Sequence, residues 1–512
     1  MAEPSLLSIR KLRPLKPDNS NPKAVNPTRN IWVGLLVAQA VATLQVRQSN
    51  LALHAKMEAV RQAGFLSVPN LYVLPSLKAL TSAFWGGLFF TFSIGAALTL
   101  GTMTAAWLLP CAGSRSPFQR YLPIFLWALL LIWINLSGFD LYVDLYFVLI
   151  PPVVFLCNRR RIETDRKWRN MVIHVLPVII LALMWFTQFD RHLFVDIRDR
   201  LLLSNPIGQR INHFYYQYTL YAAEVFKSPS QKLIKTSFID ISPESSQHQI
   251  LEHILSRFDW LPVESGVPVD LIIRQNQQKL ELMGAGRVVS TTTIGEMRRK
   301  PGIILQQFAQ KTDRYDHFRR MTFYGLLYGF PILLYLGAHG VFRRLWGLLP
   351  NVHKSVGLAS ASCLLLGVVI WVFFQQGRVD IAGSENIAEA LSSGRWQAQV
   401  AALRRCREEG IDVRRMVVYP TLKKSVHIPV RYWLVDALAV SRLPQVGDEL
   451  TDFLDDPSLN VSSRACAVLG QRGDPKVIEK LLHLVNESKE WYLQFYSYNA
   501  LKALGWNQTV SE

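Results

Sequence analysis

Long apolar runs constrain this chain more than any other feature of its 512 residues. Each of six runs is about long enough to cross the hydrocarbon core of a bilayer, which takes roughly 20 apolar residues per helix. They lie at 82–109, 121–137, 140–157, 171–188, 322–342 and 355–374. Half of the residues are hydrophobic, which is typical of a protein with several spans, so the sequence predicts a mainly α-helical, polytopic membrane bundle.

A seventh apolar run, at 31–46, is shorter and carries Gln39 and Gln45. Such a segment either crosses the membrane or lies along its surface as an interfacial helix. We expect it to cross, which makes about seven spans: five within 31–188 and two within 322–374. If it does not cross, either the N-terminal tail or the rest of the chain changes side.

Basic residues flank the apolar runs and account for much of the net charge of +18. They cluster in a polar tail at 1–30, in the loop at 158–170 and at Arg343 and Arg344. The positive-inside rule places these clusters in the cytoplasm, and an odd number of spans then places the C-terminus outside. We expect a bacterial inner membrane, because nothing in the sequence marks an organelle. No basic face typical of nucleic-acid binding stands out, so we expect no nucleic-acid partner.

Residues 189–321, between the fifth and sixth spans, have the pattern of a small extracytoplasmic α+β domain. It begins with a tyrosine-rich amphipathic helix at 211–226, whose rings suit the level of the lipid headgroups. Alternation of apolar and polar residues then predicts strands, and a helical period predicts one helix. The expected order is a strand at 233–241, a helix at 245–258, and strands at 269–275, 279–285 and 287–293.

Residues 375–512 have a helical period and contain an internal repeat. The segment 430–438 aligns with 461–469 and again with 493–501, at offsets of 31 and 32 residues. A turn at 470–475 reads Gly-Gln-Arg-Gly-Asp-Pro. The pattern resembles the HEAT-like repeat of the phycobilisome-lyase type, with its V-R-x-x-A-x-x-A-L helix and G-D-P turn. That resemblance implies an α-solenoid. Similar arrays mostly bind proteins, so it also implies a protein partner for residues 384–506.

Asp140 and Asp144 are the only acidic residues in any predicted span, and a spacing of four puts them on one helix face. Pro151 and Pro152 follow and are expected to kink the helix. Carboxylates inside a membrane are costly and mark ion or proton pathways, so the pair is a candidate ion or proton site. Alternatively, the span begins at Gly138, and both carboxylates are then hydrated near the outer interface.

No motif for a cofactor, a metal or an enzymatic nucleophile is recognisable in the sequence. We therefore expect no cofactor, and no residue argues for an enzyme. The best prediction is an integral membrane scaffold, or an accessory or assembly subunit of a membrane complex. It would sit among membrane lipids and bind a protein partner through its HEAT-like repeats. The alternative is a transporter or channel that uses Asp140 and Asp144.

Overall fold

The computed structural model describes residues 27–111, 117–159, 168–188, 192–264, 266–349, 355–376 and 386–508. The predicted tail and the basic loop at 158–170 fall mostly outside the described residues. The chain is mainly helical, with one small sheet and a helical array at its C-terminal end, as predicted.

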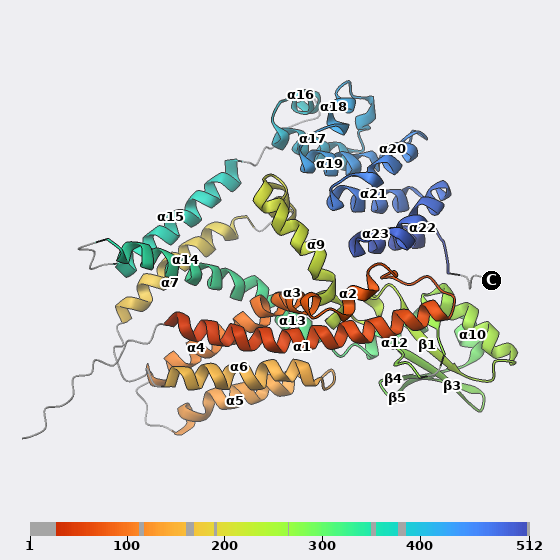
Figure 1. The fold of residues 1–512 in the computed structure, drawn as a ribbon, viewed down its shortest axis with the longest axis horizontal. Coiled ribbons are helices and arrows are strands. Elements are labelled where there is room, and N and C mark those ends of the chain that lie inside the picture. Colours follow the sequence, from red (N-terminus) through yellow and green to blue (C-terminus); the bar gives the residue numbers. More distant parts are fainter. Residues whose placement is uncertain are drawn as a thin grey trace, which may run out of the picture.

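One long helix, α1 (Pro27–Gln62), organises the bundle of apolar helices. Its 36 residues give a rod about 54 Å long, which runs from the apolar helices to the edge of the sheet (Figure 1). Helices α3 (Leu80–Phe90), α4 (Ala96–Cys111) and α6 (Leu141–Arg159) pack against it. Helix α5 (Pro117–Ile134) lies beside α6 (Figure 1). The predicted run at 31–46 is thus only part of a longer helix.

Two π-helical segments pack against each other within the bundle. Segment η1 (Thr91–Gly95) joins α3 to α4, and η4 (Gly325–Gly329) joins α13 (Asp316–Tyr324) to α14 (Phe330–Gly347). A Cβ atom on Gly325 would lie 2.6 Å from the carbonyl oxygen of Ser93. Only glycine permits backbones to approach this closely.

Three helical stretches among the described residues are long and apolar enough to cross a membrane: Leu80–Ala106, Asp316–Gly347 and Ser355–Gln375. Tyr121–Ile134, Leu141–Cys157 and Val175–Phe186 are apolar but shorter. The count of seven spans therefore stays a prediction. Helix α15 (Ser355–Gln376) packs on α7 (Trp168–Phe186) and on α14, and α14 also packs on α4 and α1 (Figure 1).

The α+β domain holds a five-stranded sheet in the order β2-β1-β3-β4-β5. Strands β1 (Lys235–Asp240), β4 (Lys279–Gly284) and β5 (Arg287–Thr292) lie within the predicted ranges, as does helix α10 (Ser246–Arg257). Strand β3 (Leu271–Asn276) overlaps its predicted range and ends one residue beyond it. The predicted order lacks β2 (Trp260–Pro262), which pairs in parallel with β1. Three residues are too few to display a strand period, so only the sheet reveals this strand.

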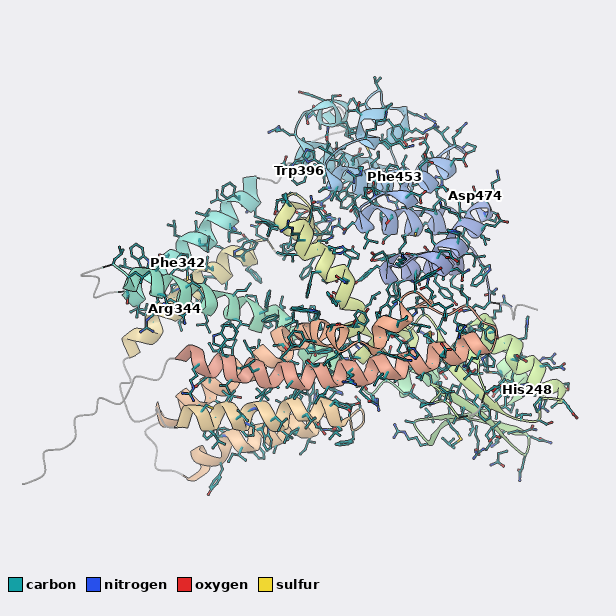
Figure 2. All side chains as sticks on the ribbon, viewed as in Figure 1. His248, Phe342, Arg344, Trp396, Phe453 and Asp474 are labelled. Carbon is teal, nitrogen blue, oxygen red and sulfur yellow. The ribbon has the colours of Figure 1, made fainter. Side chains whose placement is uncertain are left out.

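The C-terminal array is built of helix pairs, as the repeat predicted. Helices α17 (Trp396–Glu409), α19 (Ile428–Leu438), α21 (Leu459–Arg472) and α23 (Trp491–Ala503) stack in a row. Helices α18 (Tyr419–Lys423), α20 (Val446–Asp452) and α22 (Ile478–Glu487) alternate with them in sequence. Leu438, Leu469 and Leu501 are each fully buried, which confirms the register of the repeat. Figure 2 places Asp474 at the turn between α21 and α22, directly after Gly473 in the left-handed conformation.

A bent connector joins the apolar helices to the α+β domain. It consists of α8 (Leu193–Ile197), η2 (Arg198–Leu202) and the amphipathic helix α9 (Pro206–Phe226). Asn205 caps α9 by accepting a hydrogen bond from the backbone of Gly208. The connector lies between the bundle and the helical array (Figure 1).

Candidate functional site

The two predicted carboxylates lie in different surroundings although they are one turn apart. Asp140 precedes the first residue of α6 and caps it, and its other oxygen accepts from the Tyr315 hydroxyl at 2.8 Å. The Arg314 guanidinium lies 3.3 Å from the same oxygen. Asp144 lies within α6 and accepts from the Asn135 amide at 2.7 Å. Each carboxylate thus has its own partners, and the two share none of those named here.

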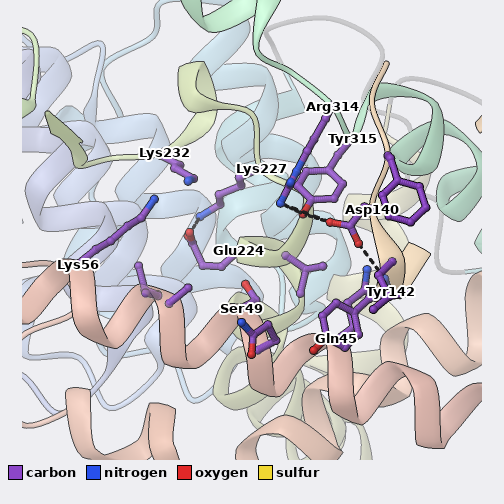
Figure 3. A pocket seen from close by; sticks show the side chains of 16 residues that line it. Gln45, Ser49, Lys56, Asp140, Tyr142, Glu224, Lys227, Lys232, Arg314 and Tyr315 are labelled. Atoms are coloured by element: carbon purple, nitrogen blue, oxygen red, sulfur yellow. Dashed lines mark hydrogen bonds and ion pairs between the residues drawn. The ribbon is translucent and has the colours of Figure 1, made fainter. Parts of the chain in front are cut away.

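Asp140 lines a cavity of about 400 Å³, and Asp144 does not. The cavity lies between α1, the start of α6, the end of α9 and the segment just before α13 (Figure 3). It is therefore at one end of the apolar part of α6, not halfway along it. Four cations line it as well: Lys56, Lys227, Lys232 and Arg314.

One buried carboxylate behind the cavity holds two of these cations. Asp270 lies 2.7 Å from the ammonium of Lys56 and 3.0 Å from that of Lys232. Burial alone raises the pKa of Asp270, but the two lysines outweigh it and hold the pKa well below its usual range. Burial and the neighbouring Lys232 lower the pKa of Lys56. The cavity wall thus carries positive charges that lie close to one another.

A second cluster of buried charge joins the connector to the helical array. Asp196 and Asp199 are 4% and 1% exposed. The guanidinium of Arg404, on α17, donates to Asp196 at 2.6 Å and to Asp199 at 3.0 Å. The indole of Trp433, on α19, donates to Asp199 at 2.7 Å, and Arg198 pairs with the same carboxylate at 2.8 Å. These charge-assisted bonds tie the connector to two successive helices of the row.

Helix α9 continues the contact along the row. The ring of Tyr216 lies 4.4 Å from that of Tyr492, and the ring of Tyr221 lies 5.2 Å from that of Trp491. Asn460 on α21 donates to the Tyr216 hydroxyl at 2.9 Å. The expectation that the tyrosines of this helix lie among lipid headgroups is wrong for Tyr216 and Tyr221, because they pack on aromatic residues of α23, with Tyr216 half-buried and Tyr221 buried.

The last repeat docks on the loop that follows α1. The side chain of Asn70 donates to the carbonyl oxygens of Val485, Asn486 and Ser488, at 2.9, 2.8 and 3.0 Å. These belong to the end of α22, whose last carbonyls need partners from outside the helix. The backbone of Asn70 also donates to the Gln494 side chain on α23 at 2.9 Å.

The same repeat also reaches the α+β domain. The hydroxyl of Tyr498 donates to Asp259 at 2.6 Å. Burial and the Asp259 carboxylate raise the pKa of Tyr498, so the hydroxyl keeps its proton and stays a donor. The side chain of Gln508 closes the array by bonding both backbone groups of Leu66, at 2.8 and 3.1 Å.

Residues 416–502 match the family model of HEAT repeats. No curated protein and no solved structure matches the chain. The match lies within the C-terminal region, 375–512, in which the sequence predicted HEAT-like repeats, and confirms them there.

The C-terminal helical array, which contains the matched HEAT repeats, therefore uses one side to hold its own chain. Contacts with the connector, the 66–73 loop and the sheet come from α17, α19, α21, α23 and the end of α22. The repeat sequence contained a weak signal for this side, because its first helices carry aromatic residues such as Trp433 and Tyr492 where a surface helix carries polar ones. Of the residues that line the cavity, the sequence singled out Asp140, but no sequence signal pointed to its lysines, because they come from segments far apart in the chain.

Proposed function

We propose that this chain is an integral membrane scaffold, or an accessory or assembly subunit of a membrane complex, that binds a protein partner through its HEAT repeats. The observation that carries the proposal is the docking of the repeats on the connector. Arg404 on α17 forms buried ion pairs with Asp196 and Asp199 of the connector, and Trp433 on α19 donates a hydrogen bond to Asp199. The second helices, α20 and α22, carry exposed polar residues such as Asp448 and Glu479, so they form the side that is open to a partner.

Exposed apolar side chains support a membrane location for the helices. A soluble monomer rarely exposes contiguous apolar patches larger than a few hundred Å². Here large apolar residues are exposed along α5, α7, α14 and α15, including Ile132, Leu183, Leu334, Leu365 and Phe373. A surrounding bilayer covers such residues, so membrane lipids are the proposed partners of this surface.

Charge supports the proposed orientation, with the N-terminus in the cytoplasm of a bacterium and the C-terminus outside. Asp316–Gly347 has 32 residues and is about 48 Å long, enough to cross a core of about 30 Å. Figure 2 places Arg344 near one end of the molecule and His248, in the α+β domain, at the other. If Arg344 lies in the cytoplasm, as the positive-inside rule favours, the α+β domain lies outside.

Co-purification from native membranes in a mild detergent tests the scaffold proposal. We expect a stoichiometric protein partner that is retained by the control variant Lys279→Glu, on the sheet, and lost by the double variant Asp448→Arg/Glu479→Arg. The double variant reverses the charge on the side of the repeats that is open to a partner. It leaves unchanged the residues through which the repeats contact the rest of the chain. A monodisperse lone protein contradicts the scaffold proposal, and a partner that survives the double variant contradicts its location.

The alternative, a transporter or channel, draws on one observation, that Asp140 lines a polar cavity. Asp140→Asn and Asp144→Asn separate the two proposals. Under the scaffold proposal, both variants keep the partner, because neither residue lies in the repeats. Under the transport proposal, either variant abolishes ion or proton flux into proteoliposomes, since an ionisable group is lost.

A further inference from the structure

Gln45 provides an unused hydrogen-bond donor at the cavity. It lines the cavity and is only 3% exposed. Its side-chain oxygen accepts from the Tyr146 hydroxyl at 3.0 Å, which sets the orientation of the amide. The amide nitrogen has no partner. A buried N–H group without a partner costs about 1–3 kcal/mol, so a ligand that accepts from it gains that donor without breaking another bond.

Positive charge exceeds negative charge around the same space. Three carboxylates are paired with the cations of the wall: Asp140 with Arg314, Glu224 with Lys227, and Asp270 with both lysines at once. One carboxylate for two ammonium groups leaves one positive charge without its own counter-charge. Lys56 is 16% exposed and Lys232 is 22% exposed at the side chain, so bulk water screens this excess only in part.

We propose that this cavity binds a phosphate group, either that of a phospholipid headgroup or free inorganic phosphate. A phosphate brings negative charge and several acceptor oxygens, which suit two ammonium groups, a guanidinium and an amide N–H.

Two features of the surroundings favour the lipid as the source. Phe139 and Leu141 line the cavity and are 69% and 57% exposed, so apolar surface lies next to the charged wall. They stand where the apolar helix α6 begins, which is the level of a headgroup if α6 lies in a membrane. The lipid source thus rests on the proposed membrane location, whereas binding of free phosphate does not.

Two probes and one matched pair of variants test the site on the purified full chain. Sodium phosphate is titrated by calorimetry, and retained phosphatidylglycerol is counted by native mass spectrometry against diacylglycerol, which lacks the phosphate. Gln45→Glu keeps an acceptor for Tyr146 and replaces the unused donor by a repelling oxygen. Gln278→Glu makes the same charge change at an exposed turn of the sheet and serves as the control.

We expect the wild type and Gln278→Glu to bind at least one phosphate probe. We expect the affinity of Gln45→Glu for that probe to be lower by a factor of about ten or more. Binding of the lipid alone identifies a headgroup site, and binding of sodium phosphate identifies a site for the free ion. If neither probe binds the wild type, or if Gln45→Glu binds as well as the wild type, the proposal is overturned.

Lys56→Gln is the second variant, used if Gln45→Glu does not fold. Asp270 then still pairs with Lys232, so folding is preserved while one cation of the wall is removed. We expect the same loss of binding, and unchanged binding contradicts the proposal. A chain that binds phosphate but co-purifies with no protein contradicts only the scaffold function, so the two failures are distinguishable.

Discussion

Arg404 is the residue whose removal tests best whether the HEAT repeats are held by their own chain. The Arg404→Ala variant removes the guanidinium that joins Asp196 to Asp199. Arg405, its neighbour on the same helix, is 43% exposed at the side chain and pairs with Glu409 in the next turn. Arg405→Ala is therefore a matched control that alters charge and helix propensity equally.

The expected free-energy cost of Arg404→Ala depends on the partners that Asp196 and Asp199 retain in the variant. Breaking one partner of a buried ion pair costs about 3–5 kcal/mol. Asp199 retains Arg198 at 2.8 Å and Trp433 at 2.7 Å, and Asp196 retains Arg200 at 3.5 Å. Because these partners remain, we expect a cost near the lower end, about 3 kcal/mol. This corresponds to roughly a hundredfold increase in the undocked population. An exposed pair such as that of Arg405 contributes about 0.5 kcal/mol.

Hydrogen exchange of the full chain in detergent measures this population. In Arg404→Ala, peptides that cover 193–203 and 206–226 are expected to exchange up to a hundredfold faster, while α21 stays protected. In Arg405→Ala, the exchange rates of both peptides and of α21 should resemble those of the wild type. The reasoning is refuted if the two variants exchange alike. It is also refuted if α21 loses protection together with the connector, because Arg404 then stabilises the repeats and not their docking.

Three further predictions concern the repeats, the helix crossing and the topology. Leu469→Asp is expected to unfold the repeat region, because it buries an unpaired charge; wild-type thermal stability would contradict the register. Gly325→Val is expected to cost about 1–3 kcal/mol or more through overpacking, whereas Gly337→Val, with no atom within 4 Å of its Cβ position, should leave the melting temperature of the detergent-purified protein nearly unchanged. Phosphatase and fluorescent-protein fusions should show a cytoplasmic site after Arg169 and an external site at Glu512; phosphatase activity at the first or fluorescence at the second contradicts the proposed orientation.

The sequence by itself determined the elements that rest on local periods. Leu438, Leu469 and Leu501 recur at nearly constant spacing, and this spacing predicted both the helix pairs and the burial of all three. Four of the five strands and α10 were predicted for the same reason, since each is long enough to repeat its own pattern. The length of the apolar runs predicted spans in the stretches Leu80–Ala106, Asp316–Gly347 and Ser355–Gln375.

Only the tertiary structure decided which of these elements meet. Arg404 and Asp196 are 208 residues apart, and Lys56 and Asp270 are 214 apart, so no local pattern links either pair. The same holds for Asp140, which the sequence left either inside a span or near its outer end, whereas the structure shows that it caps α6 and pairs with Arg314. The period of the apolar residues in a sequence indicates only which face of a helix is apolar. The partner that covers that face depends on how the chain packs over hundreds of residues.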